Sequence, residues 1–534
     1  MWKRVVGILS VMVLIFSLIF FRVFSLSVQD TLAMAADNQS SYRMDVTTAR
    51  GMFYDTNMEP LVNTAVDHIA AVIPTPESIT ALTSLLRGEK RDYVVEKSED
   101  YKPFTVNLGS LDINNENITL FDQPNRYGSE HLCQHVIGYL DAEGHGVDGL
   151  ERVFDDILSE STKRVSVRYQ VNALGQALTG GQLEVIEEGN NQKGVVLTID
   201  KDIQRIAETA ARKGIEKGAV VVMDTATGEI KALVSVPDYD PEDVGASLDN
   251  EKGPLINRTM TPYNVGSTFK LLVCAAALEQ GISPDTTYEC QGAIDIQGQI
   301  FHCHDLSGHG YSDMNRAVEV SCNPYFIQLA LQVGYDDIGK MADAIGFGKE
   351  DIFYTDYASA AGHMTTKEEI LNDATLANLG FGQGTLMATP IQIAKLISTI
   401  ANGGYAVTPS LIKGITDEQG GELVETIDIL EPTPVMSKKT AGIVQNFMIN
   451  VIDNGSGKKA KPKHCVAGGK TASAQTGMFK DGEELIHAWF SGFCDVGEHR
   501  YAIVVLCEEK ESGGDYAAPI FKEIVDSMEI NQKG

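Results

Sequence analysis

The pattern of hydrophobic and polar positions divides this chain into three regions. An almost unbroken apolar run covers residues 5–21, and apolar and polar residues then alternate only weakly up to about residue 190. Beyond it, the pattern predicts strands at 195–199, 219–224, 230–234, 488–493 and 501–506, and helices at 203–217, 267–280, 313–333, 390–402 and 438–453. Strands at both ends with helices between them predict an α+β fold, in which an antiparallel sheet formed by the terminal segments is flanked by helices and backed by a helical lobe.

The N-terminal apolar run predicts a membrane anchor. About 16 Val, Ile, Leu and Phe side chains, at roughly −0.3 to −0.6 kcal/mol each, outweigh the cost of roughly +2.5 to +3.5 kcal/mol for Arg22. Lys3 and Arg4 precede the run, so we expect a cytoplasmic N-terminus and place the rest of the chain outside the cell membrane. The alternative is a signal peptide with its cut site at Ala33-Met34-Ala35. An uncharged core of this length exceeds the usual signal-peptide core, which favours an uncleaved single-pass anchor.

The region between the anchor and residue 190 predicts an accessory domain. It begins with a polar, linker-like stretch at 29–43 and a short strand pair within 50–62, and it shows neither paired carboxylates nor the ligand spacing of a metal site. We therefore expect an anchor at 1–28, a non-catalytic domain at 29–190 and a domain that carries the chemistry at 191–534.

Charge excludes one class of function. The chain has 534 residues, with 43 Lys and Arg against 73 Asp and Glu, so its formal net charge is −30. A surface of this sign repels a phosphate backbone, and no basic stretch with interleaved aromatic residues offsets it. No nucleic-acid partner is expected.

Candidate chemistry begins with a Ser-x-x-Lys sequence at 267–270. The segment opens a predicted helix, so Ser267 and Lys270 share one helical face. Burial and the positive end of the helix dipole both disfavour an ammonium, which would leave Lys270 able to take the proton of a nucleophilic Ser267. The same spacing recurs at 410–413 and 456–459, so the pattern alone also fits chance.

Two further motifs single out the first of these matches. Ser321-Cys322-Asn323 offers a hydroxyl that can relay a proton and an amide that can hold a substrate carbonyl or the lysine. The segment 468–477 contains Lys470 and Thr471, a cation and a hydroxyl suited to a carboxylate, among small residues that permit close approach of a substrate backbone.

These three motifs, in this order and at these separations, resemble those of the penicilloyl-serine transferases, and specifically of the class B penicillin-binding proteins. The similarity extends over nearly the whole chain; further matching segments are Arg50-Gly51, Gly149-Leu150-Glu151, Gly382-Gln383-Gly384, Thr389-Pro390 and His487-Ala488-Trp489-Phe490. The resemblance implies a transpeptidase domain of the penicillin-binding/β-lactamase-like fold, an N-terminal pedestal or dimerisation-type domain and one transmembrane helix. It also implies a membrane-bound D,D-transpeptidase that cross-links peptidoglycan stem peptides, binds β-lactams as inhibitors and works with a polytopic glycan polymerase.

The resemblance also implies roles for individual residues. Ser267 attacks the donor carbonyl, Lys270 removes its proton, and Ser321 passes a proton to the departing D-Ala. Lys470 and Thr471 hold the terminal carboxylate. The backbone N–H groups of Ser267 and Ser473 form the oxyanion hole, and Asn323 completes the catalytic set.

One position departs from the family pattern, because Ala472 stands where the Lys-Thr-Gly element has its glycine. A methyl group there is expected to crowd the site or narrow its specificity. Two other functions are weighed. One is a β-lactamase, which would need a water-activating base and no pedestal; the other is a β-lactam sensor or inactive scaffold of the wall-synthesis machinery, for which Ala472 is the only hint.

A metal site is expected between the first two motifs. Cys290, Cys303, His309 and Cys322 offer the thiolate and imidazole ligands of tetrahedral, structural zinc, and the resemblance supports this because some class B relatives carry zinc in this region. Neighbouring histidines at 302 and 304 complicate the ligand assignment. A disulfide among the three cysteines, or free buried thiols, are the alternatives.

Overall fold

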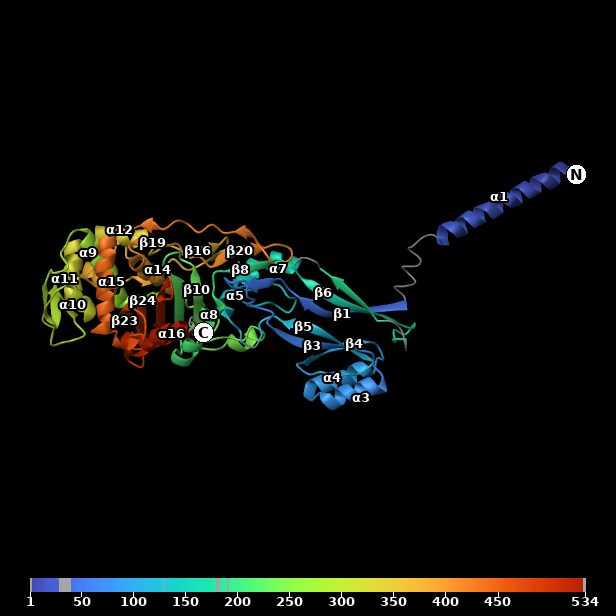
Figure 1. Cartoon of the computed structure of the whole chain (residues 1–534), viewed down its shortest axis with the longest axis horizontal. Coiled ribbons are helices and arrows are strands. Elements are labelled where there is room, and N and C mark those ends of the chain that lie inside the picture. Colours follow the sequence, from blue (N-terminus) through green and yellow to red (C-terminus); the bar gives the residue numbers. More distant parts are fainter. Residues whose placement is uncertain (1, 28–39, 129, 179–182, 190–191, 532–534) are drawn as a thin grey trace. The chain divides into compact units, whose positions relative to one another are not determined.

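A computed structural model of the chain describes residues 2–27, 40–128, 130–178, 183–189 and 192–531 (Figure 1). The chain forms two compact units: the first is Met1–Gly51, Asn63–Gly128 and Glu160–Asn191, and the second is Met52–Val62, Ser129–Ser159 and Gln192–Gly534. Two segments from the N-terminal third thus belong to the unit that holds the predicted catalytic residues. The expected domain boundary between residues 190 and 191 stays a prediction.

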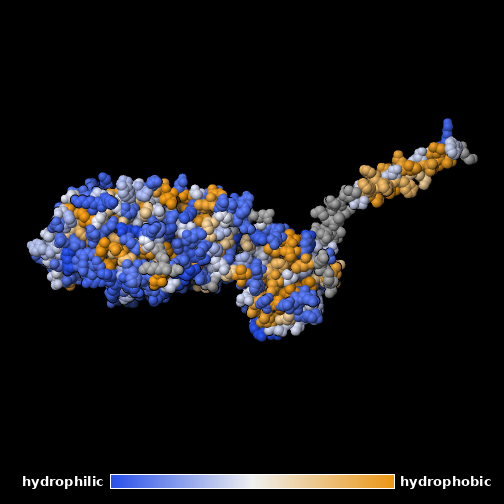
Figure 2. Space-filling model, viewed as in Figure 1, coloured by the Kyte–Doolittle hydropathy of each residue, from blue (hydrophilic) through white to orange (hydrophobic). Residues whose placement is uncertain are grey.

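The N-terminal run forms one continuous helix, α1 (Trp2–Ser27). The side chains of residues 2–24 are all exposed, and apolar side chains predominate along the helix (Figure 2). In the described part of the chain it is the one helix that is long and apolar enough to cross a membrane. This fits a single-pass anchor; the alternative cut site at Ala33-Met34-Ala35 lies outside the described residues.

The first unit contains two three-stranded antiparallel sheets, with strand orders β1-β6-β7 and β4-β3-β5. Their elements are β1 (Ser41–Ala49), β3 (Ala65–Val72), α3 (Pro76–Leu85), α4 (Gly88–Ser98), β4 (Phe104–Gly109), β5 (Ile118–Asn125), β6 (Lys163–Gln170) and β7 (Glu184–Glu188). Phe104, Val106 and Leu108 occupy alternate positions of β4 and form a core with Leu82 of α3 and Val94 of α4. Each sheet therefore buries one face, as amphipathic antiparallel strands do.

The second unit is built on a five-stranded antiparallel sheet of order β10-β9-β25-β24-β23. Its strands are β9 (Gly218–Asp224), β10 (Ile230–Val236), β23 (Ala467–Lys480), β24 (Glu483–Val496) and β25 (His499–Cys507). Since β9 pairs with β25, the predicted pairing of the terminal segments is confirmed. β23 is thus an edge strand of this sheet as far as the described residues go.

Helices cover both faces of this sheet (Figure 1). Side chains of α8 (Lys201–Gly214) and α16 (Ala518–Asn531) form one core with Val220 and Val222 of β9. On the other face lies α14 (Pro390–Ala401), where the Ser398 hydroxyl donates a hydrogen bond to the sulfur of Met223. The predicted α+β layering is thereby confirmed.

The helical lobe contains α9 (Lys270–Glu279), α10 (Met314–Glu319), α11 (Asn323–Val333), α12 (Tyr335–Ile345), α13 (Asp373–Gly380) and α15 (Lys438–Asp453). The single helix expected over 313–333 is wrong, because the chain breaks between α10 and α11. Ser321 has φ 58°, in the left-handed region, and Pro324 lies in the first turn of α11. A helix continuing through these residues would require a right-handed Ser321 and a backbone N–H that proline lacks.

The remaining strands form small sheets. A four-stranded sheet consists of β2 (Met52–Tyr54), β8 (Gly194–Leu197), β20 (Ile412–Thr416) and β21 (Leu423–Thr426), and the pairs are β11 (Tyr263–Asn264) with β18 (Met387–Ala388), β12 (Tyr288–Cys290) with β15 (Gly310–Ser312), β13 (Ala293–Ile296) with β14 (Gln299–His302), β16 (Ile352–Tyr354) with β17 (Tyr357–Ala358) and β19 (Tyr405–Ala406) with β22 (Thr433–Pro434). The short helices are α5 (Gln134–Ile137), α6 (Gly149–Val153), α7 (Asp155–Glu160), η1 (Val244–Ser247), η2 (Gly266–Phe269), η3 (Lys458–Ala460) and η4 (Gly513–Ala517).

Candidate active site

The three sequence motifs converge on the side chain of Ser321. Ser267 lies in η2, which leads directly into α9, so Lys270 follows it by one turn. Lys270 Nζ lies 3.3 Å from Ser321 Oγ, and Lys470 Nζ, from β23, lies 2.9 Å from the same oxygen. Ser321 is 51 residues from Lys270 and 149 residues from Lys470 along the chain, so distant segments contribute to one cluster.

Lys270 is fully buried and is held by carbonyl oxygens. Its Nζ donates hydrogen bonds to the Ser321 backbone oxygen at 2.8 Å and to Asn323 Oδ1 at 2.7 Å. Burial lowers the pKa of Lys270 to about 8. A neutral amine has two N–H donors and one lone pair, so Lys270 can lose a proton, keep both bonds to carbonyl oxygens and still offer the lone pair to a third group.

Ser267 is half-buried beside this lysine. Within the residues that the structure describes, its hydroxyl makes no hydrogen bond. The transfer of its proton to Lys270 therefore stays a prediction.

Lys470 is the second buried cation of the site, with no exposed surface. Besides Ser321 Oγ, its Nζ bonds the backbone oxygen of Thr471 at 2.8 Å. Burial, and then repulsion by Lys270, lower the pKa of Lys470 well below its ordinary value. An anionic group bound beside Lys470 would therefore restore its positive charge.

The turn that carries Ser321 and Asn323 is tied to the neighbouring cysteine-rich loop. Asn323 Nδ2 donates a hydrogen bond to the backbone oxygen of His302 at 3.1 Å. His302 ends β14 and precedes Cys303. Both ends of the Asn323 amide are thus engaged, one by Lys270 and the other by this loop.

Close backbone contacts position the loop before Ser267. Gly266 has φ +63° and donates its N–H to the backbone oxygen of Gly382 at 2.9 Å. A Cβ at Gly266 would lie 3.4 Å from the Ala472 methyl and 3.1 Å from that of Ala474. Ala472 is 2% exposed, so its methyl packs against the Ser267 loop and is not presented to solvent. Gly266 has no side chain, and this leaves the space that the Ala472 methyl occupies.

One residue of the cluster was missed in the sequence, where it appeared only in a chance match to Ser-x-x-Lys. Ser456 Oγ lies 2.7 Å from Thr471 Oγ1, and either hydroxyl can be the donor. Ser473, two residues beyond Thr471, is exposed on the same strand. The spacing of 14 residues between Ser456 and Lys470 carries no recognisable signal in one sequence.

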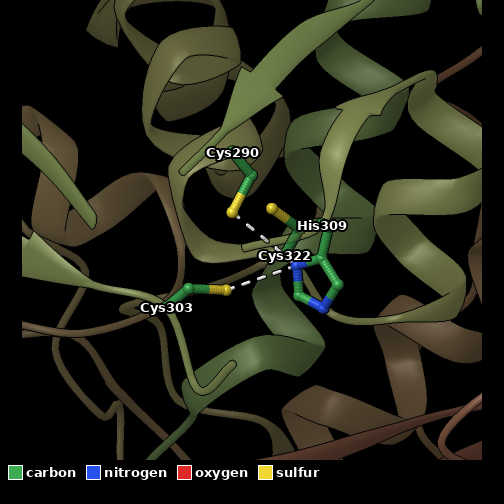
Figure 3. A group of neighbouring side chains, drawn as sticks. All are labelled: Cys290, Cys303, His309 and Cys322. Atoms are coloured by element: carbon green, nitrogen blue, oxygen red, sulfur yellow. Dashed lines mark hydrogen bonds between the residues drawn. The ribbon is translucent and has the colours of Figure 1, made fainter. Parts of the chain in front are cut away.

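The side chains of the four candidate metal ligands point toward one another, as Figure 3 shows. The ligand atoms of Cys290, Cys303, His309 and Cys322 all lie within 4.8 Å of one another. His309 Nδ1 is 3.5 Å from Cys303 Sγ and 3.7 Å from Cys290 Sγ. In a tetrahedral zinc site, bonds of about 2.3 Å to sulfur and about 2.0 Å to nitrogen place such atoms about 3.6 Å apart. The donor set fits zinc in type, number and separation.

The cysteines of this cluster are unpaired thiols, as are the other five in the chain. Hydrogen bonding from Cys322 lowers the pKa of Cys303, and the same contact raises the pKa of Cys322. His304 Nδ1 lies 3.9 Å from Cys303 Sγ, outside the four-residue group. His309 is therefore the histidine that completes the donor set.

Comparison with known proteins agrees with this geometry. Residues 218–526 match the model of the penicillin binding protein transpeptidase domain. Peptidoglycan D,D-transpeptidase MrdA of Salmonella typhimurium is 25% identical over 606 residues, covering 98% of this chain and 96% of the relative. Stage V sporulation protein D of Bacillus subtilis is 29% identical over 428 residues, which are 76% of this chain and 64% of the relative. The match thus spans less than two thirds of the Bacillus protein but nearly all of the Salmonella protein.

Solved structures show the same fold. The D,D-transpeptidase domain of a peptidoglycan glycosyltransferase from Eggerthella lenta aligns with a TM-score of 0.66 and 22% identity, over 91% of this chain and 99% of that one. Penicillin-binding protein 3 from Mycobacterium tuberculosis, complexed with aztreonam, aligns with a TM-score of 0.66 and 23% identity, over 92% and 97%.

Proposed function

This chain belongs to the penicillin-binding protein transpeptidase family, in its class B, and on that premise we propose that it is a peptidoglycan D,D-transpeptidase acting through a serine acyl-enzyme. One observation carries the proposal: the Ser321 hydroxyl lies within 3.3 Å of two fully buried lysine amines, one of which follows Ser267 by a single helical turn. Such a cluster is suited to moving protons between a nucleophile, a base and a leaving group.

In the first half-reaction, Ser267 Oγ attacks the carbonyl carbon of a donor ending in D-Ala-D-Ala. Lys270 in its neutral form accepts the Ser267 proton, while its two N–H groups keep their bonds to Ser321 and Asn323. Ser321, within reach of Lys270, donates a proton to the amine of the departing D-Ala and is reprotonated from the lysine. The products are a Ser267 ester and free D-Ala.

The donor is held by its terminal carboxylate. Lys470 and Thr471 supply the cation and the hydroxyl. When Ser456 is the donor of its hydrogen bond with Thr471 Oγ1, the Thr471 proton is free to face the carboxylate. We assign the oxyanion to the backbone N–H groups of Ser267 and Ser473; one such donor is typically worth about 2.7 to 4 kcal/mol.

In the second half-reaction, an amine of a neighbouring stem peptide attacks the ester and Ser267 is released, so that a peptide cross-link replaces the bond to D-Ala. A β-lactam resembles the donor, and its ring opens as it acylates Ser267. It leaves the enzyme acylated because the ring-opened product keeps the leaving nitrogen attached.

Labelling with a fluorescent penicillin tests this function. We expect stable labelling of the wild-type protein and none of Ser267→Ala. If the wild-type protein took no label, it would be an inactive scaffold. If it released the label rapidly, it would be a β-lactamase.

The membrane arrangement follows from α1. We propose that Lys3 and Arg4 stay in the cytoplasm and that the chain beyond α1 lies on the other side of the membrane, where the peptidoglycan is. A polytopic glycan polymerase is the proposed partner, because cross-linking needs a supply of nascent strands. Protease treatment of intact spheroplasts should degrade the chain beyond α1 and spare the N-terminus.

Structural zinc is proposed for the Cys290, Cys303, His309 and Cys322 group. Family membership does not by itself imply a metal, so the proposal rests on the donor geometry of this chain. When bound, zinc would supply a fixed crosslink between the loop at 290–309 and the turn at 321–323. We expect about one zinc per chain by elemental analysis of protein purified without chelators, and less than a tenth of that in Cys303→Ser. A Cys303–Cys322 disulfide found by mass spectrometry in zinc-free protein would refute the site.

A further inference from the structure

The strand that carries Lys470 continues well past the catalytic cluster. Residues 467–472 and 474 of β23 are buried, whereas 475 and 477–480 are exposed. Among the strands that the structure describes, β24 alone pairs with β23, so the other edge of this distal half carries no described strand. The β23–β24 hairpin therefore presents solvent-facing backbone and side chains beside the site.

A bulge interrupts the pairing in this distal half. Gln475 pairs with Ile486 and Phe479 pairs with Glu484, so three residues of β23 lie opposite one of β24. Gly477 within the bulge has φ +71°, a conformation that favours glycine. Bulges redirect side chains and are common beside active sites.

Glu484 fixes the conformation of the bulge. Its Oε1 accepts the Gly477 N–H at 3.0 Å, and its Oε2 accepts Gln475 Nε2 at 2.7 Å. Thr476 Oγ1 adds a bond to the Leu485 backbone oxygen at 2.7 Å. The Glu484 carboxylate thus binds both the side chain before the bulge and the backbone within it.

Two apolar side chains beside the bulge are exposed to solvent. Met478 is 55% exposed and Phe479 is 69% exposed. The hairpin closes immediately beyond them at Asp481 and Gly482, both with positive φ, as in a tight type I′ turn. The pair is therefore presented to solvent on a short, closed hairpin.

The position of the bulge along β23 fits the path of a donor peptide. The Ser267 loop crosses β23 at Ala472 and Ala474. Lys470 and Thr471, proposed above to bind the terminal carboxylate, mark where a donor would end. The residues before the scissile bond must then run in the other direction, past Ala474. Ala474 pairs with His487 and Phe479 pairs with Glu484, so these two positions are three residues of β24 apart, roughly 10 Å at about 3.3 Å per residue, or the length of about three peptide residues.

We propose that Met478 and Phe479 are specificity-determining residues that contact the donor stem peptide upstream of its D-Ala-D-Ala end, with Glu484 as the positioning residue. The proposal rests on the proposed transpeptidase function. The partner is an extended peptide with aliphatic side-chain segments, since the edge of β23 opposite β24 offers backbone pairing and the bulge offers apolar contact. The pair is expected to make the enzyme prefer a complete stem peptide over a short mimic.

The test compares two donors, a pentapeptide stem and an N-acetyl-D-Ala-D-Ala dipeptide that is too short to reach the bulge. The readout is the ratio of their kcat/KM values. We expect the double variant Met478→Ala with Phe479→Ala to lower this ratio about tenfold while leaving the dipeptide value unchanged. Val424→Ala is the matched control, because Val424 is a 59% exposed residue on the edge strand β21 of another sheet.

Glu484 is tested through its dependence on the same pair. Glu484→Ala should lower the ratio in the wild-type background and should lower it no further in the double-alanine background. Glu484→Gln keeps one acceptor oxygen and should restore part of the preference.

An unchanged ratio in the double variant, or an equal fall in Val424→Ala, would overturn the proposal. Fluorescent-penicillin labelling of each variant reports its folding and its Ser267 chemistry. A wild type that takes no label and turns over neither donor removes the transpeptidase function and this proposal together, whereas normal labelling with an unchanged ratio removes this proposal alone.

Discussion

The segments 267–270 and 456–459 have the same Ser-x-x-Lys spacing, and the structure places their lysines in opposite surroundings. Lys270 is fully buried among carbonyl oxygens. Lys459 lies on the surface, where its side chain is 60% exposed and pairs with Asp515, itself 59% exposed. Removal from water is what favours the neutral amine, so spacing alone does not make a base.

The two serines, unlike the two lysines, both contribute to the site. Ser267 begins the buried helix, but Ser456 also reaches the site, through the hydroxyl of Thr471. A segment can therefore contribute one residue to the chemistry while its lysine remains a solvent-exposed charge. Each of the following variants tests one half of this contrast.

Replacing the buried lysine should have the largest effect. Lys270→Met replaces the lysine by an unbranched side chain of similar size that has no amine, so it removes the base. We expect acylation by a fluorescent penicillin to slow by about 10² to 10⁴-fold. The matched variant Lys459→Met removes only an exposed charge pair and should acylate at the wild-type rate. Equal rates for Lys270→Met and wild type would show that the proton of Ser267 goes elsewhere.

Much of this site was predictable because its residues lie in short motifs on strongly patterned elements. Residues 219–223 form an uninterrupted apolar run and became part of β9, which is buried along its whole length. The run after Ser267 became α9, nearly all of it buried. Local pattern and tertiary burial agree in these elements, so the position of Lys270 followed from its place in the helix.

Other features depend on contacts that the sequence pattern does not encode. Ser456 and Thr471 meet across a loop, and no periodicity reports the distance between them. The break at Ser321 depends on one residue in the left-handed conformation, which the helical periodicity of apolar residues does not reveal. The distal β23–β24 hairpin is solvent-exposed and lacks alternation, although Asp481-Gly482 is a strong turn signal that marks it.

The pH dependence of acylation sharpens the contrast in burial. Because the pKa of Lys270 is lowered to about 8, its neutral, proton-accepting form increases as the pH rises through that value. From pH 7 to pH 9 we expect the second-order rate of acylation by an uncharged-side-chain penicillin to rise about tenfold and then level off. The rate is measured by stopped-flow quenching or by timed labelling. A flat profile over this range would mean that Lys270 is already neutral at pH 7 or is not the base.

The smallest effect concerns the serine of the second segment. Ser456→Ala removes one hydrogen bond to Thr471, and a single neutral hydrogen bond is worth about 0.5 to 1.5 kcal/mol, which corresponds to a fall of about 2- to 12-fold in kcat/KM for acylation. The loss should depend on Thr471: in a Thr471→Val background, Ser456→Ala should cost little more, because the hydroxyl that Ser456 orients is already gone. Additive losses in the double variant would show that Ser456 acts independently of Thr471. The unchanged rate expected for Lys459→Met then separates the serine of this segment, which serves the site, from its lysine, which does not.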